Sequence, residues 1–152
     1  MLDEQKRPIC YDSGRIIANG DDYMDAVSDE ELLKVIKDFL EMGYVDNIAA
    51  MFQQDPGYLE WTGAVLDDER LNVRLGVSVL FEELQARNCP DLNRAAGSLQ
   101  PLLESEQPLL RGEALSVLAI INGPELRPIA ERMSSDDNPQ IREIAADILE
   151  SL

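Results

Sequence analysis

Residues 123–152 carry the clearest copy of a pattern that recurs along the chain and constrains its fold more than any other feature. Residues 125–133 predict a first helix, and Pro139 opens a second helix after a polar turn. Asp136 lies in that turn, and Arg142 follows six residues later. Because one helical hairpin is too thin to bury its own apolar stripe, repeated hairpins must pack against one another.

Two further copies of the pattern precede this one. Asp68 and Arg74 have the same six-residue separation, and Arg111 opens the second helix of a middle copy, in which Ser105 takes the place of the aspartate. The three arginines are 37 and 31 residues apart, so the connections between the copies differ in length. Apolar residues follow each arginine at helical spacing: Val77, Leu80 and Phe81; Ala114, Val117 and Leu118; Ala145, Ile148 and Leu149.

The pattern resembles the HEAT repeat, and its short period is similar to the compact prokaryotic version. The resemblance covers residues 57–152, with residues 28–55 as a degenerate capping hairpin. It implies an all-α fold, a right-handed α-α superhelix or solenoid of about four helical hairpins, formed by residues 28–152 as one domain. It also implies a ladder between successive repeats, made of five residues that we call the ladder residues: Asp68, Arg74, Arg111, Asp136 and Arg142.

Start and stop signals predict eight helices in four hairpins. Ser28 and Glu31 are spaced as a capping box at the start of the first helix. Gly43 is expected to end that helix in the left-handed conformation. Asp46 and Asp91 are expected to cap the second and fifth helices.

The longest predicted helix covers residues 69–87. Leu75 and Val79 lie off its main apolar stripe, which predicts a central helix that neighbours contact on several sides. Pro101 is expected to kink or restart the fifth helix. Gly123 is expected to end the sixth helix.

Residues 1–27 are predicted to form a separate N-terminal arm. The arm is either a small hairpin closed at Ser13 and Gly14, an extended segment on the first helices, or a disordered terminus. Cys10 and Cys89 have no framework spacing, so free thiols in a reducing compartment are expected, with a disulfide between the two as the alternative. The sequence has no apolar leader and no long apolar run, so we expect neither a signal peptide nor a membrane span. A cytoplasmic location is predicted.

The charge balance restricts the classes of partner. Thirty acidic residues against thirteen basic ones give a net charge of −17. Such a chain repels phosphate, and its lysines and arginines form no concentrated stripe. We therefore expect no nucleic-acid partner and no anionic membrane surface. The acidity either serves solubility through self-repulsion or attracts a basic protein partner.

Few residues suggest catalysis. The chain contains no histidine, which removes the most common general base and the most common zinc ligand. The acidic clusters at residues 67–69 and 135–137 are expected at helix starts, where carboxylates interact with the helix dipole. No phosphate-binding or calcium-binding motif is present, so we expect no catalytic residue, no metal and no cofactor.

The sequence favours a non-enzymatic interaction or scaffold module, either a monomer or a weak homodimer. By the HEAT resemblance, the second helices line one face, which would be acidic and bind a basic protein or peptide. The alternatives are a lyase-like or regulatory subunit of an enzyme, and an acidic inhibitor that mimics nucleic acid. Ile144 and Leu152 are expected at an end open to a partner or a second copy. The predicted partner face consists of Glu82, Glu83, Glu113, Glu143 and Asp147.

Overall fold

A computed structural model of the chain describes residues 27–152. Within this range all regular secondary structure is helical, without a strand, so the predicted all-α class is confirmed. The arm predicted for residues 1–27, with its hairpin at Ser13 and Gly14 and the thiol of Cys10, lies outside the described residues apart from its last residue. No helix of the described part is long and apolar enough to cross a bilayer.

Eight α-helices and three 3₁₀ segments follow one another along the described chain. They are α1 (Asp29–Glu41), α2 (Val45–Gln54), a 3₁₀ segment (Pro56–Trp61), α3 (Thr62–Leu66), α4 (Leu71–Ala86), a second 3₁₀ segment (Leu92–Ala95), α5 (Ala96–Leu99), a third 3₁₀ segment (Gln100–Glu104), α6 (Pro108–Ile121), α7 (Leu126–Met133) and α8 (Pro139–Ser151). The predicted third and fifth helices are thus each divided into short α and 3₁₀ pieces. Pro101 lies at the start of the third 3₁₀ segment, which confirms the predicted restart.

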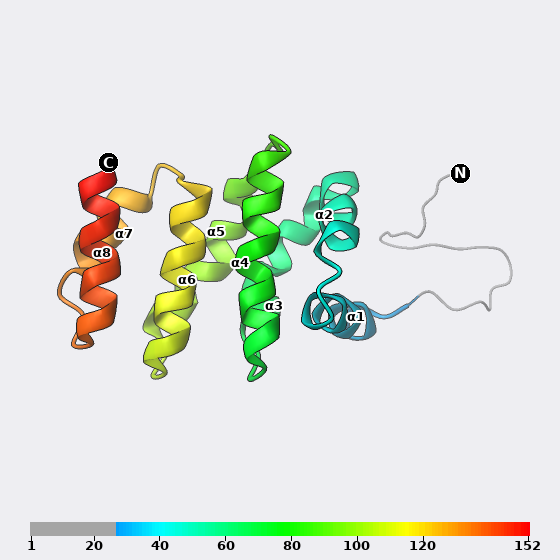
Figure 1. Ribbon diagram of the computed structural model, residues 1–152, viewed down its shortest axis with the longest axis horizontal. Coiled ribbons are helices and arrows are strands. Elements are labelled where there is room, and N and C mark those ends of the chain that lie inside the picture. The colour runs from blue at the N-terminus through cyan, green and yellow to red at the C-terminus, as the bar shows by residue number, and fades with distance from the viewer. Residues whose placement is uncertain (1–26) are drawn as a thin grey trace, which may run out of the picture. The chain divides into compact units, whose positions relative to one another are not determined.

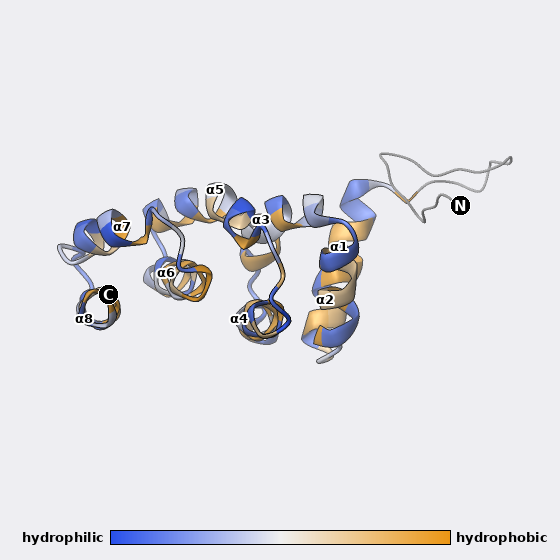
Figure 2. Cartoon of the chain, turned by 90° about the horizontal axis from the view of Figure 1, so that it is seen from above, coloured by the Kyte–Doolittle hydropathy of each residue, from blue (hydrophilic) through white to orange (hydrophobic). Residues whose placement is uncertain are grey.

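The chain divides into two units, Met1–Lys34 and Val35–Leu152, with the boundary inside α1. In the larger unit, α4, α6 and α8 lie side by side in one layer (Figure 1), and α3, α5 and α7 form a second layer against it (Figure 2). Along the first layer α4 contacts α6 and α6 contacts α8. The pairs α3–α4, α5–α6 and α7–α8 connect the two layers. We call α4, α6 and α8 the long helices.

The core of the larger unit lies between these two layers. Its side chains recur at helical spacing on one side of each long helix, as the sequence predicts, and each fully buried leucine or valine contributes roughly 1.5–3 kcal/mol. The buried apolar residues of the long helices are Val73, Val77, Leu80, Phe81 and Leu84 on α4, Leu110, Ala114, Leu115, Val117 and Leu118 on α6, and Ile141, Ala145 and Ile148 on α8.

Two of the predicted helix signals are confirmed by their geometry. The backbone N–H of Glu31 donates to Ser28 Oγ at 3.1 Å, and the backbone N–H of Ser28 donates to Glu31 Oε1 at 3.2 Å, which completes the capping box. Gly43 adopts a φ of +89° at the end of α1. Glycine is favoured there because the left-handed region is costly for residues with a Cβ atom.

Three other signals are wrong. Asp46 does not cap α2, which begins one residue earlier, and its carboxylate instead lies 3.5 Å from Arg87. Asp91 has a φ of +66° and makes no capping hydrogen bond. The left-handed residue that ends α6 is Asn122, with a φ of 55°, and not Gly123. Asparagine and aspartate tolerate this conformation better than other residues with side chains, so they replace glycine at such stops.

Candidate functional site

Three turns between the short helices and the long helices share one hydrogen-bonding pattern. Side-chain oxygens of Asp68, Ser105 and Asp136 each accept the backbone N–H two residues ahead, at 2.8, 3.1 and 2.9 Å. Such a turn satisfies an amide that the coming helix leaves without a partner. Ser105 therefore occupies the structural position of the two aspartates, in the register that the sequence predicts.

Each of the three ladder arginines also holds the turn that precedes its own helix. Nη1 of Arg74, Arg111 and Arg142 donates to the backbone carbonyl of the residue six positions earlier, at 2.9, 2.8 and 2.7 Å. The six-residue spacing in the sequence thus corresponds to one repeated contact. Because one end of the planar guanidinium is fixed, the direction of its remaining N–H groups is fixed as well.

Arg111 connects the α6 hairpin to the α8 hairpin. Its Nε and Nη2 donate to the two carboxylate oxygens of Asp136 at 3.0 and 2.9 Å, and the two side chains are only 12% and 9% exposed. The hydrogen bond from Arg111 lowers the pKa of Asp136, and Asp136 in turn raises the pKa of Arg111. Asp137 also accepts from Nη2 at 3.1 Å, but it is 94% exposed.

Arg74 couples α4 to α6 through a different acid. Because Ser105 has no carboxylate, the partner of Arg74 is Glu113, whose Oε1 lies 2.7 Å from Nε. These two atoms are buried and paired by charge, but they do not have hydrogen-bond geometry. Burial raises the pKa of Glu113 more than the charge of Arg74 lowers it. Glu113 therefore does not belong to an open partner face, and its inclusion there is wrong.

Asp68 is paired by two cations that sequence reasoning missed. Lys37 Nζ lies 3.3 Å from Asp68 Oδ2, and Arg70 Nε lies 3.0 Å from Asp68 Oδ1. The hydrogen bond from Arg70 is the main reason that the pKa of Asp68 is well below its usual range. Lys37 precedes Arg74 by 37 residues, the same interval that separates Arg74 from Arg111. The repeat spacing could therefore have identified Lys37 as the equivalent of the ladder arginines.

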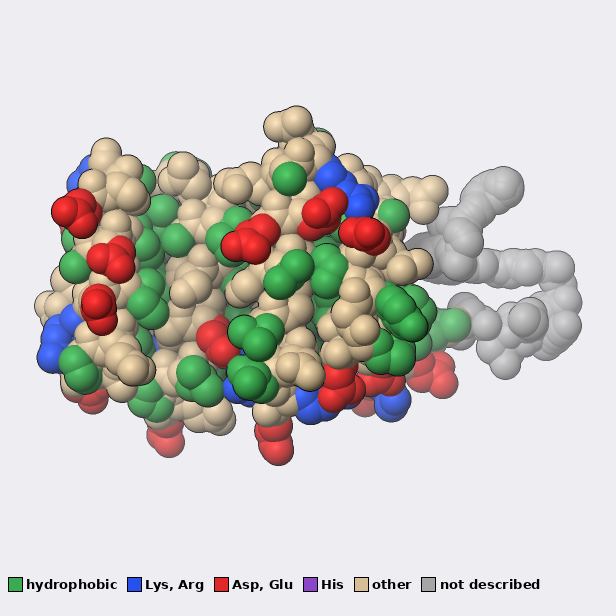
Figure 3. Space-filling model, in the orientation of Figure 1, with side chains coloured by type: hydrophobic (Ala, Val, Ile, Leu, Met, Phe, Trp, Pro, Cys, Tyr) green, Lys and Arg blue, Asp and Glu red, His purple; other side chains and the backbone are tan. Residues whose placement is uncertain are grey.

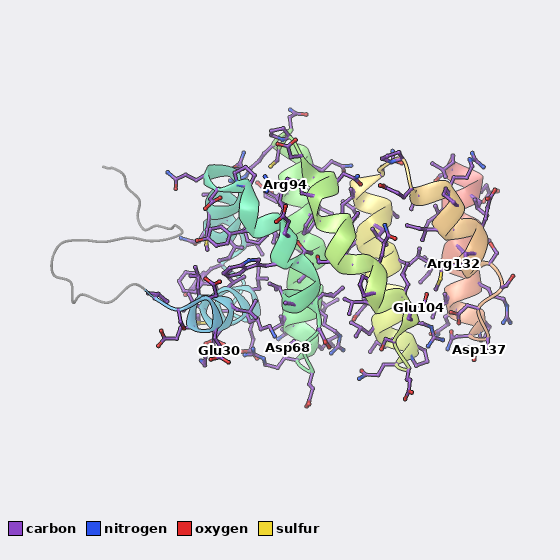
Figure 4. The ribbon with its side chains drawn as sticks, turned by 180° about the vertical axis from the view of Figure 1, so that it is seen from behind. Glu30, Asp68, Arg94, Glu104, Arg132 and Asp137 are labelled. Atoms are coloured by element: carbon purple, nitrogen blue, oxygen red, sulfur yellow. The ribbon has the colours of Figure 1, made fainter. Side chains whose placement is uncertain are left out.

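Arg142 is the ladder residue with the fewest contacts. Beyond the bond to its own turn, no carboxylate of residues 27–152 lies within ion-pair distance of its guanidinium. Asp68 and Asp137, from the first and last of the three turns, lie along one edge of the larger unit (Figure 4). Among the five ladder residues, Arg111 and Asp136 form the one direct pair between hairpins. Each of the three arginines also binds the turn before its own helix.

The residue two positions after each ladder arginine faces a helix from an earlier hairpin. A Cβ atom on Gly76 would lie 2.9 Å from Leu40 Cβ, so only glycine allows this approach. At the equivalent position of α6, Glu113 meets Arg74. In α8 this position is Ile144, which lies against Gly112 of α6 and not at an open end as predicted.

The opposite side of α4 and α8 is exposed, whereas on α6 the same side holds a buried Gly112 and a half-buried Ser116. On each long helix we compare three positions relative to its ladder arginine. The first lies three residues before the arginine, the second one residue after it, and the third five residues after it. We call these nine residues the long-helix face: Leu71, Leu75 and Val79 on α4; Pro108, Gly112 and Ser116 on α6; Pro139, Glu143 and Asp147 on α8.

The α4 part of the long-helix face is apolar. Leu71, Leu75 and Val79 are 52%, 50% and 48% exposed. The predicted contacts on several sides of this helix are confirmed, because α4 contacts α2, α3 and α6. These neighbours nevertheless leave Leu75 and Val79 half-exposed. Figure 3 shows hydrophobic side chains over α4 and acidic side chains over α8 on this side of the larger unit.

Three of the predicted partner-face acids are free on the surface. Glu82, Glu143 and Asp147 are exposed, and none of them forms an ion pair with a described residue. Glu83 is different, because Arg87 Nε lies 2.8 Å from its carboxylate one turn along the same helix. Within the predicted partner face, the exposed acids without an ion-pair partner among the described residues therefore lie at the end of α4 and on α8.

The described residues offer little for chemistry. No three acidic or cysteine side chains of residues 27–152 are grouped so that they could hold a metal ion. Cys89 is a buried free cysteine, and burial raises the pKa of its thiol, which keeps the thiol protonated and unreactive.

No family model, no curated protein and no solved structure matches this chain. The resemblance to HEAT repeats therefore rests on the residue pattern of the sequence.

Proposed function

We propose that this protein is a non-enzymatic interaction module, built as a short HEAT-like α-solenoid, whose long-helix face binds a basic protein or peptide. The solenoid part of the proposal is supported by the three equivalent turns, in which the same hydrogen bonds recur at Asp68, Ser105 and Asp136. In such an arrangement each hairpin contacts its neighbours, and one row of helices presents a continuous surface.

The observation that carries the binding proposal is the set of unpaired carboxylates on one side of the long helices. Glu82, Glu143 and Asp147 are exposed and have no cationic partner among the described residues, whereas Asp68, Asp136 and Glu113 are paired inside. Free carboxylates in a chain of net charge −17 attract cations from a distance and accelerate their association.

Fluorescence anisotropy with labelled decalysine tests this proposal. The affinity should fall about tenfold or more between about 50 and about 500 mM NaCl, because salt screens exposed charges. The variant E143Q/D147N should weaken binding about threefold to tenfold. The control E106Q/E131Q removes the same charge at exposed positions outside the face and should change the affinity less than about twofold. An affinity independent of salt, or equal weakening by the control, contradicts the proposal.

A further inference from the structure

The three long helices carry different chemistry at equivalent positions of the long-helix face. One residue after the ladder arginine, α4 has Leu75, α6 has Gly112 and α8 has Glu143. Five residues after it, the same series is Val79, Ser116 and Asp147. The face therefore changes from apolar through small to acidic in the order α4, α6, α8.

The apolar part forms a continuous stripe, since Leu71, Leu75 and Val79 follow at four-residue intervals on one side of α4. Half-exposed large apolar side chains in such a row are typical of surfaces that bind another molecule. On α6, Gly112 is buried and Ser116 is half-buried, so no large side chain projects from α6 at these two positions toward a partner that rests on the stripe.

The charge of the chain selects among occupants. A second copy carries the same net charge of −17 and is repelled, as is an anionic membrane surface. A cationic partner is attracted, because Glu82 lies one turn beyond Val79 and the carboxylates of Glu143 and Asp147 lie two helices away.

We propose that the long-helix face binds a cationic helix that crosses α4, α6 and α8, with apolar residues over the α4 stripe and lysines or arginines over Glu143 and Asp147. The inference rests on the proposed function and names its partner class. A helix is favoured because a row of side chains at four-residue intervals fits between the rows of another helix.

Helix geometry sets the length of this partner. Packed helices have axes roughly 8–10 Å apart, so the two steps from α4 to α8 span about 18 Å. At about 1.5 Å per residue, a helix needs about 12 residues to cover this span. The partner helix is therefore at least about three turns long, with apolar residues toward one end and basic residues toward the other.

Two labelled helical peptides of about 15 residues and identical composition test the inference. In the block peptide, leucines occupy one half and lysines the other; in the mixed peptide, they alternate along the length. Each is titrated, beside decalysine, into the parent, L75S/V79S and M42S. Met42 is an exposed apolar residue outside the long-helix face and serves as the matched control. Circular dichroism and sedimentation verify the fold and the monomeric state of each variant.

The block peptide should bind the parent about tenfold more tightly than decalysine or the mixed peptide. L75S/V79S should remove that gain without changing the affinity for decalysine, and M42S should change neither. If L75S/V79S leaves the affinity for the block peptide unchanged, or if the mixed peptide binds equally well, the inference is overturned while the proposed function stands. If decalysine does not bind, the proposed function fails. If the parent dimerises and L75S/V79S is monomeric, a second copy covers the stripe and the inference is overturned.

Discussion

The exposed sides of α4 and α8 differ completely although both helices follow the same kind of turn. Each helix begins after an aspartate whose side chain accepts the N–H two residues ahead, and each carries an arginine that binds the aspartate's carbonyl. On the exposed side, however, Leu75 corresponds to Glu143, and Val79 corresponds to Asp147. The backbone geometry is thus held by contacts inside the molecule, and the outward positions are free to vary.

This difference separates residues that maintain the fold from residues that can serve binding. An inward substitution changes buried charges or packing and should affect stability, whereas an outward substitution should affect binding and leave the fold intact. Substitutions on the inward and outward sides of the long helices test this separation.

Charge reversal at Arg111 should have the largest effect. R111E removes the two-fold contact with Asp136 and places a third carboxylate beside Asp136 and Asp137. The melting temperature, followed by circular dichroism, should fall by roughly 10 °C. The control R132E disrupts an exposed pair with Glu104 at 3.7 Å and should shift it by less than about 2 °C. Equal melting of R111E and the parent contradicts the assigned role of Arg111.

Removing the carboxylate of Glu113, and then supplying one at position 105, should have the next largest effect on stability. In E113I, Arg74 loses the carboxylate near its buried Nε, so the free energy of unfolding should fall by about 1–3 kcal/mol. S105D then supplies an aspartate at the turn position that Asp136 occupies in the last hairpin. The double variant should recover about 1 kcal/mol relative to E113I, measured by urea unfolding. If S105D has the same effect in both backgrounds, the two positions are not coupled.

The paired aspartates should produce a pH dependence. Because Arg111 lowers the pKa of Asp136, the unfolded state binds this proton more tightly than the folded state. The stabilisation is complete above the unfolded pKa of about 3.9 and is lost as the pH falls through the lower folded value. The stability difference between the parent and D136N should therefore be largest at neutral pH and shrink below about pH 4. A difference that stays constant to pH 2 is the opposing result.

Glu113 should show the opposite trend. Its pKa is raised by burial, so the folded state binds this proton more tightly than the unfolded state. The parent should gain stability relative to E113Q as the pH falls from 7 toward the unfolded pKa of about 4.3. Urea unfolding of the parent and E113Q across this range measures the trend. A parent that loses stability relative to E113Q would show that the charge of Arg74 outweighs burial.

Exchanging the exposed chemistry of α4 and α8 should change stability least. E143L/D147V and L75E/V79D should each change the free energy of unfolding by less than about 1 kcal/mol, because these four side chains are exposed. Combined in one protein, the four substitutions should retain binding of the block peptide in the reversed direction. Unfolding of the combined variant at neutral pH without denaturant contradicts the separation of inward from outward positions.

The parts of the fold that sequence reasoning predicted have local causes. The Ser28 capping box, the Gly43 stop and the equivalence of Ser105 with the aspartates each depend on a few consecutive residues, and all three are confirmed. Asn122 was missed as the left-handed residue because a glycine follows it, and glycine is the more common choice.

The pairing of side chains across hairpins was only partly predictable. The position of Glu113 just after Arg111 predicts an exposed side chain, but Arg74 of α4 reaches its carboxylate. Lys37 was missed because a lysine at the arginine position weakens the match to the pattern. The exposure of Leu75 is also not predictable from the sequence. Apolar residues on a second side of a helix have the same pattern whether a neighbouring element covers them or solvent does.

Paramagnetic broadening of amide signals tests whether one cationic helix crosses the long-helix face in a fixed direction, as we propose. The block peptide carries a spin label at its leucine end in one sample and at its lysine end in another. The first label should broaden the amides of Leu75 and Val79, and the second those of Glu143 and Asp147. Equal broadening of both helices by both labels, or broadening confined to α3, α5 and α7, contradicts the claim.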